Sequence, residues 1–159
     1  FNADAVTVNP YMGLDSLKPF FERGERGVII LCKTSNKSSG DFQDLIISST
    51  KMPLYIYVAK KAQEWNKIYE NCMLAMGSTW PDQLRKVREV APKMFLLVLG
   101  IGAQGGNLKE TLKNGHRKDR SGLIIHAGRS IIYASSKPNF ASAARKETLR
   151  LKETINKYR

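Results

Sequence analysis

The chain has 159 residues, of which 42% are apolar and 25% charged, a balance typical of a globular domain and not of a disordered or fibrous protein. No apolar run approaches the roughly eighteen residues that cross a bilayer, so we expect a soluble protein without a membrane span. The net charge is +12, but the basic residues are mixed with acidic ones and not interleaved with aromatic ones. This pattern indicates a solvated surface that could attract an anionic substrate, and not a nucleic-acid-binding face.

The chain start and the two cysteines bear on its cellular location. The first residue is not Met, and no basic or long apolar leader follows it, so we expect that the chain begins inside a longer protein. Cys32 and Cys72 both lie in apolar runs, where cysteine behaves as a small hydrophobic residue. The sequence therefore favours a reducing compartment, the cytoplasm.

Five apolar runs recur along the chain, each followed at once by a polar or glycine-rich stretch. They are Ala5–Val8, Val28–Cys32, Cys72–Met76, Met94–Leu99 and Leu123–Ala127. Because their hydrophobicity is continuous and not alternating, we expect strands covered on both faces, as in a parallel sheet.

Helical patterns separate these runs. One helix is expected to begin near Pro53, and Thr79 with Asp82 resembles a capping box for a helix that Pro92 ends. A last helix is expected from about Asn139, with an inner face of Ala144, Thr148, Leu151, Ile155 and Tyr158. Asp15, Asp41 and Asp44 are interpreted as helix caps.

The last two runs lead into a candidate phosphate site. The fourth is followed by four glycines within seven residues, among them Gly100, together with the amide of Gln104. The fifth ends in Gly128 and Arg129. Glycines let a backbone approach an anion, and a guanidinium can bind phosphate with two hydrogen bonds. We therefore expect these two strand exits to converge on a phosphate.

The place of this signal decides between two architectures. Rossmann sheets carry their glycine loop after the first strand, whereas (β/α)₈ barrels bind phosphate after the last two strands. The sequence therefore predicts an α/β fold, a (β/α)₈ TIM barrel, with residues 1–159 forming the C-terminal part of a single barrel domain. An eight-stranded barrel takes about 250 residues, so only about the last five βα units are expected in this chain.

Two other strand exits carry candidate binding residues. Thr34 and Ser35 follow the second run and can offer donors and acceptors to a heterocycle, although they could equally cap a helix. Met12 follows the first run, where it could form an apolar wall or belong to a plain turn. His126 is interpreted as a barrel residue and not as a base, and no metal site is expected.

Five ordered motifs give the chain a family resemblance. They are Ala-Asp-Ala-Val-Thr-Val-Asn-Pro-Tyr-Met-Gly, Lys-Thr-Ser-Asn, Gly-Ser-Thr-Trp-Pro, Gly-Ile-Gly-Ala-Gln-Gly-Gly and Ala-Gly-Arg-Ser-Ile-Ile-Tyr-Ala. In this order they resemble the C-terminal part of orotidine 5′-phosphate decarboxylases of the type 2 branch, from about the fourth barrel strand onward. The resemblance implies a homodimeric lyase that converts orotidine monophosphate to uridine monophosphate without a cofactor.

The resemblance also assigns roles to particular residues. Gln104, Arg129 and the amide of Gly128 would hold the 5′-phosphate, close to Gly100. Ser35, helped by Thr34, would bind the amide edge of the pyrimidine, and Met12 and Leu31 would line the base pocket. The family's catalytic motif, Asp-x-Lys-x-x-Asp, is absent from these 159 residues. We therefore expect no catalytic residue in this chain, and no activity from the chain alone.

Two other functions stay open. Because the chain has no recognisable acid, base or nucleophile set, it could be a non-catalytic nucleotide- or phosphate-binding module. It could also belong to another phosphate-binding barrel enzyme, such as a sugar-phosphate lyase.

Overall fold

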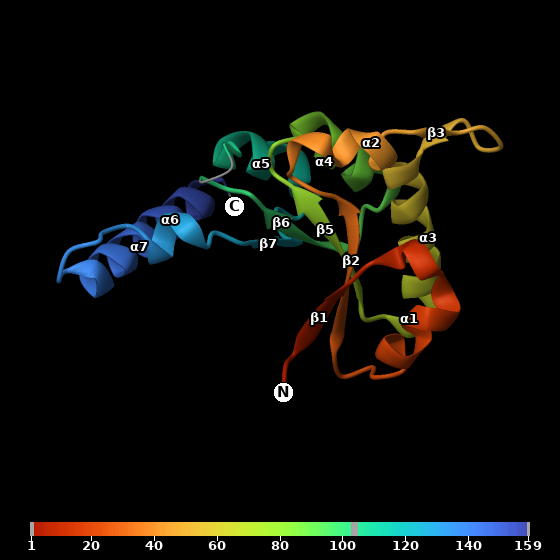
Figure 1. The fold of residues 1–159 in the computed structure, drawn as a ribbon, viewed down its shortest axis with the longest axis horizontal. Coiled ribbons are helices and arrows are strands. Elements are labelled where there is room, and N and C mark those ends of the chain that lie inside the picture. The colour runs from red at the N-terminus through yellow and green to blue at the C-terminus, as the bar shows by residue number, and fades with distance from the viewer. Residues whose placement is uncertain (1, 103–104, 159) are drawn as a thin grey trace.

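The computed structural model describes residues 2–102 and 105–158. Its centre is a five-stranded sheet in which all neighbouring strands are parallel, in the order β1-β2-β5-β6-β7 (Figure 1). The strands are β1 (Ala5–Val8), β2 (Gly27–Lys33), β5 (Cys72–Gly77), β6 (Phe95–Leu99) and β7 (Leu123–Ile125). All five apolar runs are therefore strands, and the prediction of a parallel sheet is confirmed. The last strand ends two residues earlier than expected.

Helices connect the strands as in successive βα units. The longer ones are α1 (Leu14–Phe21), α3 (Leu54–Tyr69), α4 (Pro81–Val90), α5 (Leu108–Gly115) and α7 (Phe140–Lys157), and the short ones are α2 (Gly40–Gln43) and α6 (Arg129–Ile132). A two-stranded hairpin, β3 (Ile46–Ile47) and β4 (Met52–Pro53), lies between α2 and α3 and extends from the body of the molecule (Figure 1). Single-turn 3₁₀ helices follow β1 at Pro10–Met12 and β2 at Lys37–Ser39.

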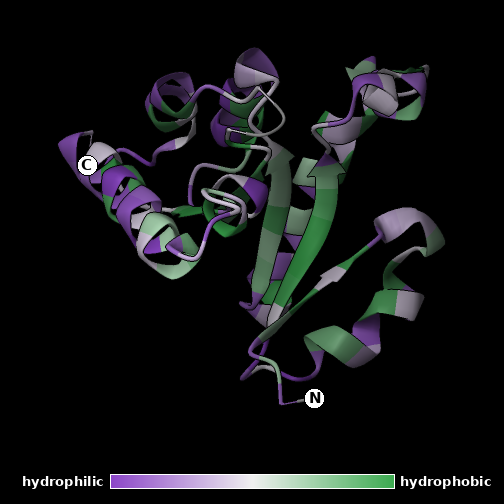
Figure 2. Cartoon of the chain, turned by 60° about the vertical axis from the view of Figure 1, so that its left-hand side comes forward, coloured by the Kyte–Doolittle hydropathy of each residue, from purple (hydrophilic) through white to green (hydrophobic). Residues whose placement is uncertain are grey.

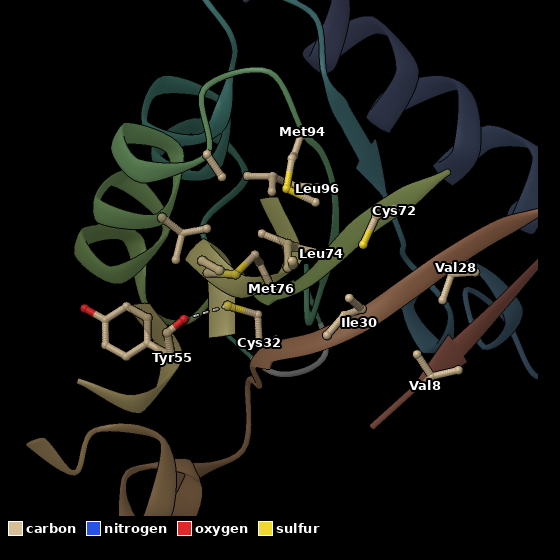
Figure 3. Packing of buried hydrophobic residues seen from close by; sticks show 14 of the residues in the cluster. Val8, Val28, Ile30, Cys32, Tyr55, Cys72, Leu74, Met76, Met94 and Leu96 are labelled. Carbon is tan, nitrogen blue, oxygen red and sulfur yellow. Dashed lines mark hydrogen bonds between the residues drawn. The ribbon is translucent and has the colours of Figure 1, made fainter. Parts of the chain in front are cut away.

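The hydrophobic core lies between the sheet and the helices on one of its faces (Figure 3). Alternate residues of the strands point into it, among them Val28, Ile30 and Cys32 from β2 and Leu74 and Met76 from β5. The thiol of Cys32 donates a hydrogen bond to the carbonyl oxygen of Tyr55 in α3, 3.2 Å away, as the dashed line shows. Apart from Thr7 and Lys33, the strands consist of apolar residues and glycine and are mostly green in Figure 2, so the opposite face of the sheet is also largely apolar.

The opposite face carries rows of residues that the sheet register places side by side. One row is Thr7, Ile29, Met73 and Phe95, and the next is Leu31, Ala75, Leu97 and Ile124. Phe95 and Ile124 are 46% and 43% exposed. Five consecutive parallel βα units with helices on one face and side-chain layers on the other form an arc of a (β/α)₈ barrel. The fold class is thus confirmed, with five of its units in this chain.

Two expected helix caps are corrected. Thr79 and Asp82 form no capping box, because Trp80 is the N-cap residue of α4 without a side-chain cap, and the Thr79 hydroxyl donates instead to the carbonyl oxygen of Ser35 at 3.1 Å. Asp44 follows α2 and pairs with Lys33 instead of capping a helix start. A long-range partner outcompetes the local cap in both cases.

The last helix begins at Phe140, as expected to within one residue, but its inner face differs. Thr148 is exposed, and Leu151 is its only buried residue. Together with α6, this helix extends away from α1 and α3 (Figure 1). Among the described residues, no helix is long and apolar enough to cross a membrane.

Candidate functional site

The carboxyl ends of the parallel strands all lie at one edge of the sheet, so the residues that follow them come together there. Ser35 after β2, Gly100 after β6, and Gly128 and Arg129 after β7 line one pocket of about 330 Å³. They are joined there by Leu99, Ile101 and His126. The sequence pattern placed four of these residues on three separate strand exits, and the structure brings all four to a common pocket.

The backbone of the glycine-rich loop requires glycine at several positions. Gly100, Gly102 and Gly105 have φ angles of 90°, 79° and 82°, in the region that side chains disfavour. A Cβ atom on Gly106 would lie 2.7 Å from the carbonyl oxygen of Gly100, so that position also needs glycine. Gly100 and Ile101, at the start of this loop, line the pocket together with Arg129, and backbone N–H groups of glycine-rich turns are common anion donors. Gln104, expected to contact the same anion, lies outside the described residues.

His126 is the residue of this pocket that sequence reasoning interpreted differently. The sequence places it within the last strand as a barrel residue, but β7 ends at Ile125, and the His126 side chain is exposed and lines the pocket beside Arg129. Its backbone N–H still donates to the carbonyl oxygen of Val98 at 2.9 Å, which continues the pairing with β6. The apolar run of the sequence extends to Ala127 and so includes His126, and its place outside the strand becomes evident only because β7 ends at Ile125.

A larger cavity of about 710 Å³ lies on the other side of the β2 exit. It is lined mainly by apolar and aromatic side chains, and its walls include Tyr11, Leu31, Thr34, Tyr57 and Trp65. Lys61 is the single Lys or Arg side chain among its described lining residues, and its partner Glu64 raises the pKa of that ammonium. The smaller pocket, which combines Arg129 with a glycine loop, is therefore the better candidate for an anion.

The remaining predicted site residues lie in or near the larger cavity. Leu31 and Thr34 line it, while the side chain of Met12 is 72% exposed and only its neighbours Tyr11 and Gly13 reach the wall. Thr34 and Ser35 are adjacent in sequence, yet they line different cavities because successive residues of an extended chain point in opposite directions. The structure thus brings together Ser35, Gly100, Gly128 and Arg129, and separates Leu31 and Thr34 from them.

The segment that carries Thr34 and Ser35 is held by side chains from two neighbouring elements. Gln43 at the end of α2 accepts a hydrogen bond from the Thr34 backbone N–H at 2.9 Å. Trp80, before α4, donates its indole N–H to the Thr34 carbonyl oxygen at 2.9 Å. The hydroxyl of Thr34 donates to the side-chain oxygen of Asn36 at 2.6 Å, so it too is bonded within the chain.

Lys33 is a further residue whose environment the sequence did not reveal. Its side chain is completely buried, and its Nζ lies 2.9 Å from the Asp44 carboxylate. The ammonium also lies 5.0 Å from the centre of the Trp80 ring. In the sequence, a lysine at the end of an apolar strand and a carboxylate eleven residues later only weakly indicate an ion pair. The folded chain shows that the two groups are paired.

Across the two described stretches, no group of three or more His, Cys, Asp and Glu side chains is arranged to hold a metal ion. The two cysteines are unpaired and buried in the core. The guanidinium of Arg129 and the backbone of Gly100 and Gly128 suit the smaller pocket to binding an anion.

Comparison with known proteins agrees with this geometry. A sequence profile of the orotidine 5′-phosphate decarboxylase / HUMPS family matches residues 1–145. An orotidine 5′-phosphate decarboxylase of Cellvibrio japonicus is 47% identical over 157 residues, which make up 98% of this chain and 56% of that protein. One of Cupriavidus taiwanensis is 46% identical over 160 residues, covering 100% of this chain and 58% of that protein.

Solved structures give the same result. That of the Leishmania donovani UMP synthase superposes with a TM-score of 0.87 at 43% identity, covering 99% of this chain and 33% of that one. The structure of the Leishmania donovani OMP decarboxylase superposes with a TM-score of 0.84 at 40% identity, covering 99% of this chain and 58% of that one. The chain thus spans 56–58% of the length of these two curated relatives. It belongs to the orotidine 5′-phosphate decarboxylase / HUMPS family.

Proposed function

We propose that this chain is the phosphate- and pyrimidine-binding part of an orotidine 5′-phosphate decarboxylase, which converts orotidine monophosphate to uridine monophosphate and carbon dioxide in pyrimidine biosynthesis. The observation that carries this proposal is the pocket in which Arg129, Gly128 and Gly100 meet Ser35. Its guanidinium and glycine backbone can bind the phosphate of a nucleotide. Its hydroxyl can form hydrogen bonds with a polar heterocycle.

In this proposal each residue has a distinct task. The guanidinium of Arg129 and the backbone N–H of Gly128 bind the 5′-phosphate, with Gln104 as a further donor to it. Ser35 binds the amide edge of the pyrimidine, supported by Thr34, and Leu31 and Met12 contribute apolar surface near the base. Binding of the remote phosphate orders the substrate at the reacting carbon, and binding energy used in this way accelerates the reaction.

The chemical step needs groups that this chain does not contain. Loss of carbon dioxide leaves a carbanion at the ring carbon, which takes a proton from an ammonium group. Lys33 is unsuited to this task because its ammonium is buried and paired with Asp44. The proton donor and the strands that close the barrel come from outside these 159 residues, and residues 1–159 act as one part of a single barrel domain. No cofactor is required.

Membership of this family also supports a proposal about the assembly and location of the protein. We propose a homodimer in the cytoplasm, acting on a small-molecule substrate without nucleic-acid or membrane partners. The buried, unpaired cysteines support a reducing compartment.

The proposal is tested by completing the barrel. The portion of the Cellvibrio japonicus relative that this chain does not match is joined to the chain, and formation of uridine monophosphate is followed by chromatography. We expect the joined protein to decarboxylate orotidine monophosphate, and neither part alone to do so.

The same preparation separates the alternatives. A folded joined protein that binds uridine monophosphate but shows no turnover would support a non-catalytic nucleotide-binding module. A larger thermal stabilisation by sugar phosphates than by uridine monophosphate would support a different phosphate-binding barrel lyase, since at equal concentration the ligand that binds more tightly stabilises the folded protein more.

A further inference from the structure

A β-bulge decides which way Lys33 points. Leu31 pairs with Ala75 of β5, and Lys33 then pairs with Met76 instead of Gly77, so β2 contains one extra residue at this place. Without it, Lys33 would face the same side as Leu31 and Ala75, the open face of the sheet. The bulge turns it to the side of Met76, where the side chains enter the core between sheet and helices.

On that side, the Lys33 ammonium touches two elements that are otherwise separate. Its Nζ donates to the Asp44 carboxylate at 2.9 Å, directly after α2, and it lies over the Trp80 ring at the start of α4. The residue before Asp44 is Gln43, which accepts from the Thr34 backbone N–H, while Trp80 donates to the Thr34 carbonyl oxygen. The ammonium therefore connects the two groups that fix the Thr34 peptide units.

The neighbouring backbone leaves Ser35 little freedom. Its carbonyl oxygen accepts from the Thr79 hydroxyl at 3.1 Å, and a Cβ atom on Gly77 would lie only 2.7 Å from both the Cα and the N of Ser35. The close approach of these two strand exits means that any shift of Asp44 or Trp80 is transmitted to the position of Ser35. Ser35 in turn lines the pocket that contains Arg129.

We propose that the Lys33–Asp44 ion pair is a positioning device that holds α2 and the start of α4 at the distance at which the Thr34 backbone places Ser35 to face the pyrimidine. This inference rests on the proposed function, because it deepens the role of the same pocket. Lys33 and Asp44 are positioning residues and do not touch the substrate.

Stability alone does not explain the pair. The Lys33 side chain is fully buried while the Asp44 side chain is 44% exposed, and desolvating an ammonium offsets much of what such a pair contributes. An apolar side chain of similar length would be stable at this position, but it would not set the distance between Asp44 and Trp80. The two roles therefore predict different results when Lys33 is replaced by an apolar residue. A positioning role predicts weaker binding of the ligand, and a purely structural role predicts no specific change in binding.

The test is Lys33→Met in the joined protein, with equilibrium binding of uridine monophosphate and of ribose 5-phosphate, a ligand that lacks the pyrimidine. We expect the dissociation constant for uridine monophosphate to rise about tenfold, since small misplacements of a binding group reduce its contribution steeply. We expect the value for ribose 5-phosphate to change less than about twofold and the urea midpoint of unfolding to stay the same or rise.

Matched variants complete the experiment. Asp44→Glu keeps the ion pair and should retain most of the affinity for uridine monophosphate, whereas Asp44→Asn should lose it. Glu89→Gln, which breaks the exposed Arg85–Glu89 pair on α4, should change neither affinity.

Unchanged uridine monophosphate binding in Lys33→Met would overturn the positioning role, and so would equal losses for both ligands, which would indicate a general structural effect. If the unsubstituted joined protein binds ribose 5-phosphate but shows no preference for uridine monophosphate, the proposed function fails and this inference fails with it.

Discussion

Arg129 is the side chain on which the phosphate assignment depends most directly. It follows β7 by four residues and shares its pocket with Gly100 and Gly128. We expect Arg129→Ala in the joined protein to reduce kcat/KM for orotidine monophosphate by at least about a hundredfold, because a charge-assisted bidentate contact to the phosphate is lost. For the nucleoside orotidine, which has no phosphate, the reduction should be less than about threefold. Equal reductions on the two substrates would contradict the assignment.

The two buried thiols predict how stability depends on pH. Burial raises the pKa of both Cys32 and Cys72 to about 12, above the value of about 8.5 for an exposed thiol. Because the unfolded chain loses these protons first, the free energy of unfolding falls as pH rises from about 9 towards 12.

Between pH 8 and pH 10 we expect a loss of about 2 kcal/mol per cysteine, measured by urea unfolding. The variant Cys32→Ala/Cys72→Ala is the control, since it keeps the lysine and tyrosine titrations and should lose about 4 kcal/mol less over this interval. Identical pH profiles for the two proteins would show that the thiols ionise equally in the folded and unfolded chain.

At the scale of elements, Arg88 joins three parts of the structure. It lies on α4, is only 8% exposed and donates to five carbonyl oxygens, those of Ala91, Pro92, Met94, Gly115 and Gly122. These carbonyls belong to the connection from α4 to β6, to the end of α5 and to the connection into β7. Burial lowers the pKa of the guanidinium to about 10, and it nevertheless stays charged at neutral pH.

We expect Arg88→Met to reduce the free energy of unfolding by about 3 kcal/mol or more, because several buried carbonyl oxygens would lose their donor. Arg85→Met on the exposed side of the same helix is the matched control. It removes only a solvent-exposed ion pair with Glu89, and should cost less than about 0.5 kcal/mol. Equal midpoints of urea unfolding for the two variants would refute the connecting role of Arg88.

The elements themselves were largely predictable. Each continuous apolar run became a strand, and Pro53 and Asn139 marked the starts of helices to within one residue. The prediction of a helix cap failed at Thr79 and Asp82. Their spacing matches a capping box, but the Thr79 hydroxyl donates to the carbonyl oxygen of Ser35 instead. A local signal of this kind is worth about 1 kcal/mol, so one long-range hydrogen bond can override it.

At the scale of the whole molecule, the sheet is an arc with one covered face and one open face. The open face carries partly exposed apolar side chains, Phe95 and Ile124 among them, arranged in the rows that would form the inside of a closed barrel. An apolar surface of this kind is stable only when it is covered. The joined protein is therefore the appropriate form for every measurement of binding and activity.

The sequence by itself determined the order of strands and helices, the parallel sheet and the residues at each strand exit, because these follow from local hydrophobicity and from the rule that such exits share one edge. The tertiary structure alone decided which of these residues meet: Ser35 lies with Arg129, Thr34 turns to another cavity, and Lys33 is buried against Asp44. For Lys33 the physical reason is the bulge in β2, one extra residue in the pairing with β5, which turns its side chain to the opposite face of the sheet.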